Sequence, residues 1–264
     1  MVKLLPVPLG IGVLAGGLLV WERRARKHAE RLGAATLETL LATIDANDAV
    51  TGAHVRRVAD YSLILVDAAG FEERIRRSIE RVALFHDIGK IHEAITDIFH
   101  DGSRLTPAER RAVMTHPLRG AQVLAPLAYF FPDLPEGVLC HHERWDGKGY
   151  PRHLKGTQIP ISARIVAIAD TFDAITHTRP YKKGRSVTDA TNALLAGRGT
   201  QFQAELVDLF LSPPVMELIE LSMAKTFAPS RKNQRRGRGK VSRPVPDITF
   251  RWRTVDAAPR QRDR

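Results

Sequence analysis

The sequence predicts an all-α protein, and three observations support this. Apolar residues recur at helical spacing through most of the 264-residue chain, whereas the apolar–polar alternation that is typical of β-strands is scarce. The segments that interrupt these helical stretches are short and rich in glycine and proline. An uncharged apolar run near the N-terminus is also long enough to form a helix that crosses a membrane.

The first predicted element is a transmembrane anchor within residues 1–21. Leu4–Trp21 contains no charged residue, and four basic residues follow closely, whereas only Lys3 and the amino terminus are positive before it. The stronger positive flank favours the cytoplasmic side. We therefore expect a single-pass membrane protein, with the rest of the chain in the cytoplasm. The alternatives are a soluble N-terminus and a cleaved signal peptide, which would need small residues where Trp21–Arg24 stands.

A juxtamembrane helix is predicted at residues 22–36, leading into a domain of residues 37–222. Helical character extends over residues 22–45, where the apolar stripe consists of Leu32, Leu37, Leu40, Leu41 and Ile44. A domain of this size can bury a sizeable core without disulfides or structural metals.

Further along, a capping box marks the start of a helix at Thr106–Glu109, with proline in the first helical position. We expect this helix to carry Met114 and His116 near its far end. Residues 143–160 contain five glycines and prolines and are predicted to form a loop, followed by a helix at residues 161–176.

The positive charge is concentrated at the C-terminus. The formal net charge is +11, and residues 231–264 account for +9 of it, which leaves +2 for everything before them. The high isoelectric point therefore describes a tail and not a nucleic-acid-binding catalytic face. We predict that residues 223–264 form a basic, disordered tail. A solvated tail, contact with anionic lipid and contact with nucleic acid are the alternatives for its role.

A single cysteine, Cys140, excludes an intramolecular disulfide framework and suits a reducing compartment. It directly precedes two histidines that are candidate metal ligands. We expect Cys140 to be a buried packing residue, because imidazoles and carboxylates already fill the candidate site.

Seven side chains of types that bind metals follow one another along the chain. Two of the histidines lie on apolar helix faces: His86 shares one with Ile79 and Val82, and His54 shares one with Val58. One such histidine is ordinarily a core residue, but several buried polar groups need a compensating partner, and a cation satisfies them together. Two metal ions held close together are a common device for phosphate-ester hydrolysis. The candidate ligands are His54, His86, Asp87, His116, His141, His142 and Asp170.

The last ligand helix offers a second carboxylate beside the predicted ligand. Asp170 and Asp173 are three residues apart and are expected together at the edge of the apolar stripe. Asp173 either orients a ligand or the leaving group from behind, or is an ordinary aspartate on the helix surface.

Three motifs give the chain a family resemblance. H-D-I-G-K occupies 86–90, H-H-E-R-W-D-G-K-G-Y-P occupies 141–151, and A-D-T-F-D-A-I-T-H-T-R-P-Y occupies 169–181. At these residues the chain resembles the HD-GYP family of bacterial cyclic di-GMP phosphodiesterases, from about Leu37 to about Phe210. The resemblance implies an HD-type helical bundle with a buried binuclear metal site. It also implies hydrolysis of cyclic di-GMP to pGpG, GMP or both by a metal-bridging hydroxide.

The resemblance also implies roles for the candidate ligands. His54, His86, Asp87 and Asp170 match the four ligands of the wider HD superfamily, in which Asp87 would bridge two metals. His116, His141 and His142 match the additional histidines that distinguish the HD-GYP family. Imidazole with carboxylate suits iron, manganese, zinc, cobalt or nickel better than magnesium or calcium, and the resemblance favours iron or manganese. Some members carry a glutamate for a third metal where this chain has Val50. We therefore expect two metals.

Substrate contacts follow from the same resemblance. Lys90 is expected to point its ammonium at a non-bridging phosphate oxygen, which makes Asp87 and Lys90 the predicted catalytic residues. Arg179 and Lys182 are expected to bind the dinucleotide. Tyr150, in the G-Y-P segment, is predicted either to contact substrate or to support His141 and His142. Ile91-His92-Glu93-Ala94 departs from the family pattern after the H-D-I-G-K motif.

Other functions stay open at this point. The same metal site could serve another cyclic dinucleotide or a nucleotide, or the protein could be a membrane-tethered cyclic di-GMP receptor without turnover. Binding of nucleic acid by the basic tail is a further alternative. The sequence leaves regulation by a protein partner or by formation of a homodimer open.

Overall fold

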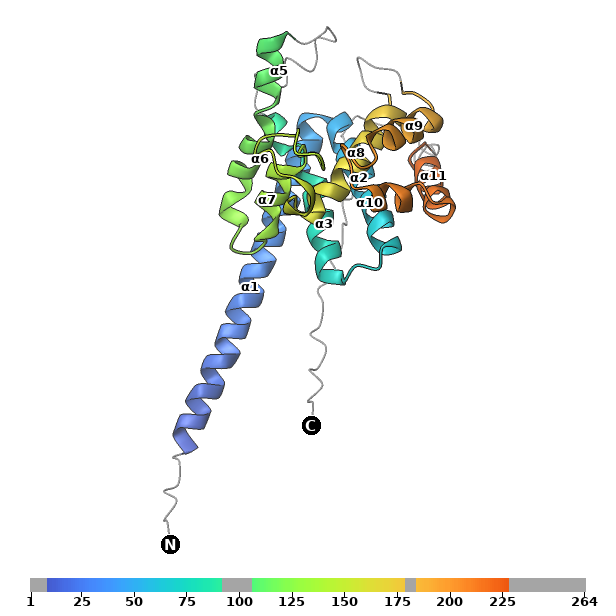
Figure 1. The fold of residues 1–264 in the computed structure, drawn as a ribbon. Helices are drawn as coiled ribbons and strands as arrows, with labels where there is room; N and C mark the ends of the chain where they lie inside the picture. Colours follow the sequence, from blue (N-terminus) through green and yellow to red (C-terminus); the bar gives the residue numbers. More distant parts are fainter. Residues whose placement is uncertain (1–8, 92–105, 179–183, 228–264) are drawn as a thin grey trace, which may run out of the picture. The chain divides into compact units, whose positions relative to one another are not determined.

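The described part of the chain is helical. The computed structural model describes residues 9–91, 106–178 and 184–227, and these residues contain α-helices and short 3₁₀ helices but no β-strand (Figure 1). The prediction of an all-α fold is confirmed. Most of the predicted basic tail, residues 228–264, lies outside the described residues.

The α-helices vary widely in length, and the 3₁₀ helices (η) are single turns. In chain order they are α1 (Leu9–Asn47), α2 (Ala49–Ala68), α3 (Glu73–Phe85), η1 (Ile88–Ile91), α5 (Pro107–Val113), α6 (His116–Leu124), η2 (Ala125–Leu127), α7 (Asp133–Cys140), η3 (Gly156–Gln158), α8 (Ile161–Thr176), α9 (Val187–Gly197), α10 (Ala204–Phe210) and α11 (Pro213–Phe227).

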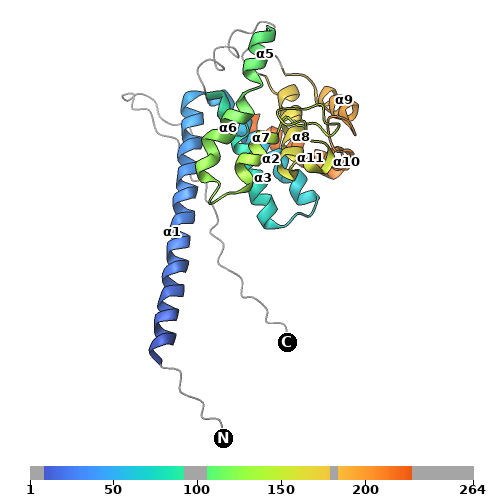
Figure 2. The same ribbon diagram turned by 60° about the vertical axis from the view of Figure 1, so that its left-hand side comes forward.

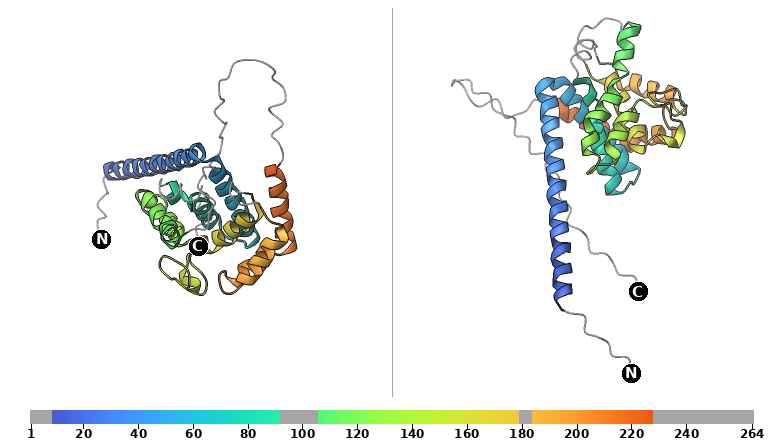
Figure 3. Two further views of the ribbon diagram at one scale, coloured as in Figure 1. Left: turned by 90° about the horizontal axis from the view of Figure 1, so that it is seen from above. Right: turned by 90° about the vertical axis from the view of Figure 1, so that its left-hand side faces the viewer.

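Three helices form the centre of this fold. α2, α3 and α8 pack against one another, and α7 contacts both α3 and α8 (Figure 2). α6 packs on α7 and η1, whereas α9 packs on α8 and α10 and α11 pack on α2 (Figure 3). Tyr61 on α2, Phe172 on α8 and Phe210 on α10 are fully buried and meet edge to face. The apolar stripes predicted for α2 and α8 therefore meet in one core.

α1 joins the core only through its last turns, where Leu37, Leu41 and Ile44 are buried. The helix is continuous from Leu9, so it has no break at the predicted boundaries after residues 21 and 36. No described helix combines the length and the apolar character needed to span a membrane. The first residues of the predicted span, 4–8, lie outside the described residues.

The helix predicted to carry His116 is shorter than expected. Its capping box is present: Thr106 Oγ1 accepts from the Glu109 N–H, and the Glu109 carboxylate accepts from the Thr106 N–H. The helix ends at Val113, however, and His116 opens the next helix. Pro117 explains the break, because proline lacks an N–H and is tolerated only in the first turn of a helix.

The other boundaries bear directly on the site. His86 follows the last residue of α3, and His141 follows the last residue of α7. α8 covers the residues predicted for it, 161–176, and the segment before it is a loop with one 3₁₀ turn. α11 runs through residue 222, which was predicted to be the end of the domain, to Phe227.

Gly89 lets η1 approach the start of α6 closely, and its replacement should destabilise the fold. A Cβ atom at Gly89 would lie 2.1 Å from the carbonyl oxygen of His116. We expect Gly89→Ala to lower the free energy of unfolding by about 1–3 kcal/mol, because the backbone must move to make room for the added methyl group. Denaturant unfolding followed by circular dichroism measures this.

Gly120→Ala is the matched comparison on the other side of the same contact. A Cβ there would first meet a methyl group of Val138 at 3.0 Å, which can shift more easily than backbone. Gly120→Ala should lower the free energy of unfolding clearly less than Gly89→Ala does. Equal decreases for the two variants would contradict the close-approach explanation.

Candidate metal centre

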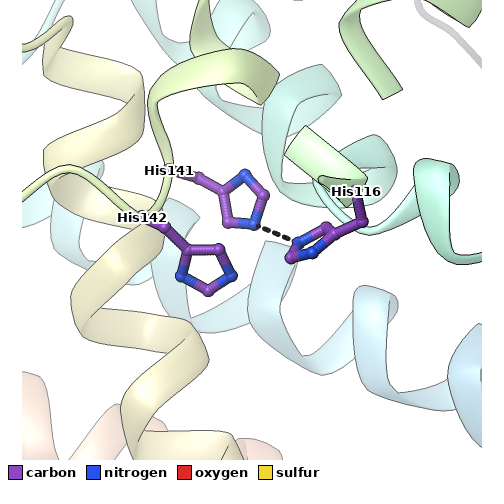
Figure 4. Close-up of side chains that lie close together, drawn as sticks. All are labelled: His116, His141 and His142. Carbon is purple, nitrogen blue, oxygen red and sulfur yellow. Dashed lines mark hydrogen bonds between the residues drawn. The ribbon is translucent and has the colours of Figure 1, made fainter. Parts of the chain in front are cut away.

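Two clusters of metal-binding side chains lie inside the described fold. One consists of His54, His86 and Asp170, and the other consists of His116, His141 and His142. In each cluster the three candidate ligand atoms lie within 4.8 Å of one another. Figure 4 shows the second cluster, whose three rings converge from α6 and from the end of α7.

The carboxylate of Asp87 lies between the clusters. Its Oδ2 is 3.7 Å from Nε2 of His54 and 3.5 Å from Nε2 of His86. Its Oδ1 is 3.4 Å from Nε2 of His116 and 3.9 Å from Nε2 of His141. One oxygen therefore faces each cluster. Asp87 itself is buried in the turn between α3 and η1.

Backbone carbonyls orient three of the imidazoles. Nδ1 of His86, His116 and His141 lies 2.8, 2.7 and 2.6 Å from the carbonyl oxygen three residues earlier. A carbonyl oxygen only accepts, so each Nδ1 carries the hydrogen. In the neutral ring Nε2 then has its lone pair free for a metal. The three rings are thus fixed in the tautomer that a metal site requires.

His54 is oriented differently, through a side chain. Its Nδ1 lies 2.6 Å from Oδ2 of Asp173, which is fully buried on α8. The Asp173 carboxylate also accepts from Arg57 on α2 and from Nδ1 of His177. Of the two predictions for Asp173, the helix-surface aspartate is wrong, because α2 covers this side of α8.

The sequence analysis assigned no role to Arg57 or to His177. The only signal for Arg57 is its position three residues after His54, which puts both side chains on one helix face. Its buried partner lies more than a hundred residues away in the sequence, so spacing within one segment cannot find the pair.

The electrostatics keep the carboxylates ionised. Burial would raise the pKa of Asp87, but the charge of Lys90 and the neighbouring imidazoles of His86 and His116 hold it well below its ordinary value. Burial would raise the pKa of Asp170 as well, but the neighbouring imidazoles of His54 and His86 lower it. One buried and one partly buried carboxylate therefore face these imidazoles.

Two histidines of the other cluster, His141 and His142, are held in the neutral form. Burial lowers the pKa of His142 to about 3 and that of His141 well below its ordinary value, with neighbouring imidazoles adding to the effect. Neutral imidazoles are the form that binds metal.

Buried atoms without a partner test whether a metal fits. Among the described residues, Nε2 of His54, Nε2 of His86 and Oδ1 of Asp87 are buried and have no hydrogen-bond partner. Nε2 of His116 and Nε2 of His141 face each other at 3.1 Å although both Nδ1 atoms are already tied to carbonyls (Figure 4). Buried polar atoms are rarely left unpaired, and a cation in each cluster would satisfy all of them. Nitrogen with carboxylate oxygen fits a transition metal.

Two of the four predicted substrate residues, Lys90 and Tyr150, lie among the described residues beside the site. Lys90 Nζ lies 2.6 Å from Oδ2 of Asp87 and is partly exposed. Tyr150 stacks on His142 with ring centroids 5.0 Å apart, and its N–H donates to the His142 carbonyl oxygen. Tyr150 therefore supports a candidate ligand. Arg179 and Lys182 lie outside the described residues, and so do His92 and Glu93 of the segment that departs from the family pattern.

Glu143 holds the loop that follows the two histidines. Its buried carboxylate accepts from the N–H groups of Arg152 and Leu154 at 2.6 and 3.0 Å. Gly149 packs so closely on this turn that a Cβ would lie 2.3 Å from the Arg144 nitrogen. The sequence analysis gave Glu143 no role, and its position directly after the two histidines is the signal that was available.

Two further predictions concern positions beside the site. Cys140 is fully buried beside Ile159 and Ala163, which confirms it as a packing residue, and burial raises the pKa of its thiol to about 12. Val50 is 43% exposed on the first turn of α2 and offers no ligand atom.

Comparison with known proteins identifies the family. A family model described as the HD domain matches residues 38–206. The cyclic di-GMP phosphodiesterase response regulator RpfG of Xanthomonas campestris is 38% identical over 178 residues, which cover 67% of this chain and 47% of that protein. The 3'3'-cGAMP-specific phosphodiesterase 2 of Vibrio cholerae is 37% identical over 170 residues, which cover 64% of this chain and 32% of that protein.

A solved structure agrees with the fold. The crystal structure of the cyclic GMP-AMP-specific phosphodiesterase V-cGAP3 of Vibrio cholerae matches with a TM-score of 0.53 at 20% identity, over 73% of this chain and 50% of that one. The chain spans about a third to a half of the length of the two curated relatives. These findings confirm the resemblance drawn from the three motifs, and the chain belongs to the HD domain family.

Proposed function

We propose that this protein is a binuclear metal-dependent phosphodiesterase that hydrolyses cyclic di-GMP to pGpG, GMP or both. The observation that carries the proposal is the position of Asp87, with one carboxylate oxygen toward each cluster. The naming of relatives such as RpfG as cyclic di-GMP phosphodiesterases supports the choice of substrate.

Two metals fit the donor count. Each cluster offers three side chains, and Asp87 adds a fourth donor to each, so every ion would have four protein ligands. Iron or manganese is the proposed metal, and zinc, cobalt and nickel are the alternatives that the same donors allow. When bound, a metal pair lowers the pKa of a shared water and stabilises charge on the phosphoryl oxygens.

The chain's own residues supply position and charge. Asp87 would hold both sites at a fixed separation, because its two oxygens cannot move independently. Lys90 presents an ammonium beside this carboxylate, where it can bind a non-bridging phosphate oxygen. Asp173 keeps the His54 ring in the tautomer whose Nε2 is free. Arg179 and Lys182 remain proposed substrate contacts on the family resemblance alone.

Another cyclic dinucleotide is the second candidate substrate, because the similar proteins include 3'3'-cGAMP-specific phosphodiesterases. A panel of cyclic di-GMP, 3'3'-cGAMP and cyclic di-AMP, assayed by chromatography with manganese or ferrous iron present, separates these substrates. Fastest cleavage of cyclic di-GMP supports the proposal. Tight binding of cyclic di-GMP without cleavage of any dinucleotide would instead identify a receptor.

We also propose single-pass attachment to a bacterial cytoplasmic membrane. The uncharged run Leu4–Trp21, the basic residues that follow it and the exposure of Val20 and Trp21 support this. Contact of the basic tail with anionic lipid or nucleic acid, and control by a protein partner or by a homodimer, remain predictions from the sequence.

Replacement of the central carboxylate should remove both metal and activity. We expect Asp87→Asn to abolish hydrolysis and to lower bound metal below two ions per chain, because the amide cannot offer a negative oxygen to each cluster. Metal analysis by mass spectrometry and a turnover assay measure the two effects. Asp208 lies on α10 and makes an exposed ion pair with Arg198, so Asp208→Asn is the control and should behave as the wild type. Full activity of Asp87→Asn would exclude the proposed centre.

Loss of the Lys90 ammonium should weaken catalysis but spare the metals. A hydrogen bond to a charged group contributes about 1.5–3 kcal/mol, so Lys90→Met should lower kcat/KM by about 10- to 160-fold. Lys148→Met removes an exposed lysine from the loop before α8 and should leave kcat/KM unchanged. The interpretation fails if Lys90→Met and Lys148→Met give the same rate.

The membrane proposal has its own test. In cells, the full chain should sediment with membranes and resist extraction by alkaline carbonate, whereas a variant lacking residues 1–21 should remain in the supernatant. Recovery of the full chain in the supernatant would contradict the anchor without touching the proposed catalysis.

A further inference from the structure

The hydrogen bonds of Asp173 connect Arg57, which is not a candidate ligand, to the candidate metal centre. Asp173 is fully buried and accepts hydrogen bonds from three side chains. Arg57 makes two of these bonds: Nε donates to Oδ1 at 2.6 Å, and Nη2 donates to Oδ2 at 3.0 Å. The planar guanidinium therefore fixes both oxygens of the carboxylate.

The same oxygen links Arg57 to the candidate ligand. Oδ2 of Asp173, which accepts from Arg57 Nη2, also accepts from Nδ1 of His54 at 2.6 Å. If the guanidinium is removed, the carboxylate keeps its buried charge but loses the fork that sets its plane. The His54 ring is then held by a carboxylate that only His177 still positions from the other side.

The other imidazoles with a known tether do not depend on this network. His86, His116 and His141 each donate to a backbone carbonyl three residues earlier, which no side-chain substitution on α2 or α8 removes. A change at Arg57 should therefore act first on the cluster that contains His54.

We propose that Arg57 is a positioning residue that sets the metal affinity of the His54–His86–Asp170 cluster without touching the metal. The inference rests on the proposed binuclear centre. It adds that the metal affinity of one site depends on Arg57 and that of the other site does not. Loss of Arg57 weakens one site and spares the three-histidine site, because among the four imidazoles with an observed tether His54 is the one held by a charged side chain.

A purely structural role is the competing explanation, because Arg57 and Asp173 also join α2 to α8. The chain offers a close control in the adjacent residue. Arg56 lies on the same helix and makes an ion pair with Asp45 on α1, with Nη2 2.7 Å from Oδ2. Arg56→Met thus removes an arginine–carboxylate pair between two helices, but one that contacts no candidate ligand.

The experiment compares the full-length wild type with Arg57→Met, Arg57→Lys and Arg56→Met. Each metal-free protein is titrated with Mn²⁺ by calorimetry, and bound Mn²⁺ is examined by electron paramagnetic resonance. The wild type should bind two ions as a spin-coupled pair. Arg57→Met should lose about 10- to 100-fold in affinity at one site, the size typical of a residue that orients a ligand, and should give the signal of an isolated ion.

Two further results are expected. Arg57→Lys keeps the positive charge but cannot donate two parallel hydrogen bonds, so its loss of Mn²⁺ affinity at this site should be intermediate. Arg56→Met should bind two ions as the wild type does, even if its unfolding temperature falls.

The inference is overturned if Arg57→Met binds two ions normally, if it loses both sites equally, or if Arg56→Met shows the same loss. A wild type that binds no Mn²⁺ overturns it together with the metal centre. These titrations contain no dinucleotide, so a failure of cyclic di-GMP turnover alone would leave the inference standing and would count only against the proposed substrate.

Discussion

The candidate site depends on one buried carboxylate whose two oxygens face different groups of imidazoles. An ionised aspartate away from water costs several kcal/mol unless positive charge or hydrogen bonds compensate it. Asp87 has one ammonium nearby, that of Lys90, while its Oδ1 faces two imidazole nitrogens without a hydrogen bond. Cations in both clusters would balance this charge and join five helical elements around one centre. Metal binding and the packing of these elements are thus expected to be linked.

Helix ends explain how three of the imidazoles are placed. The last four carbonyls of an α-helix have no partner within the helix. The carbonyls that hold His86, His116 and His141 belong to Ala83, Val113 and Val138, which lie in the last turns of α3, α5 and α7. Each histidine thereby satisfies a carbonyl that its helix leaves free and directs its other nitrogen inward. The partial negative charge at a helix C-terminus also favours a cation close by.

Much of this arrangement could be predicted from the sequence, because its signals are local. Apolar periodicity indicated that His54 is buried, and the Gly/Pro-rich loop before α8 was evident from its composition. The parts that failed depend on competing or distant contacts. The capping box at Thr106 was identified correctly, but the effect of Pro117 on the helix that follows was overlooked. Asp173 could have been a surface residue on its spacing from Asp170 alone, since only the packing of α2 on α8 buries it.

The different treatment of His54 follows from where it lies. It is well inside α2, where nearby carbonyls are already engaged by amides four residues later. Its Nδ1 therefore needs an acceptor from elsewhere, and Asp173 on α8 provides one. A carboxylate in that position introduces a buried charge that a carbonyl would not, and this charge requires Arg57 beside it. The buried network behind His54 is thus the cost of taking a ligand from the middle of a helix, whereas ligands at helix ends are held by backbone that is present in any sequence.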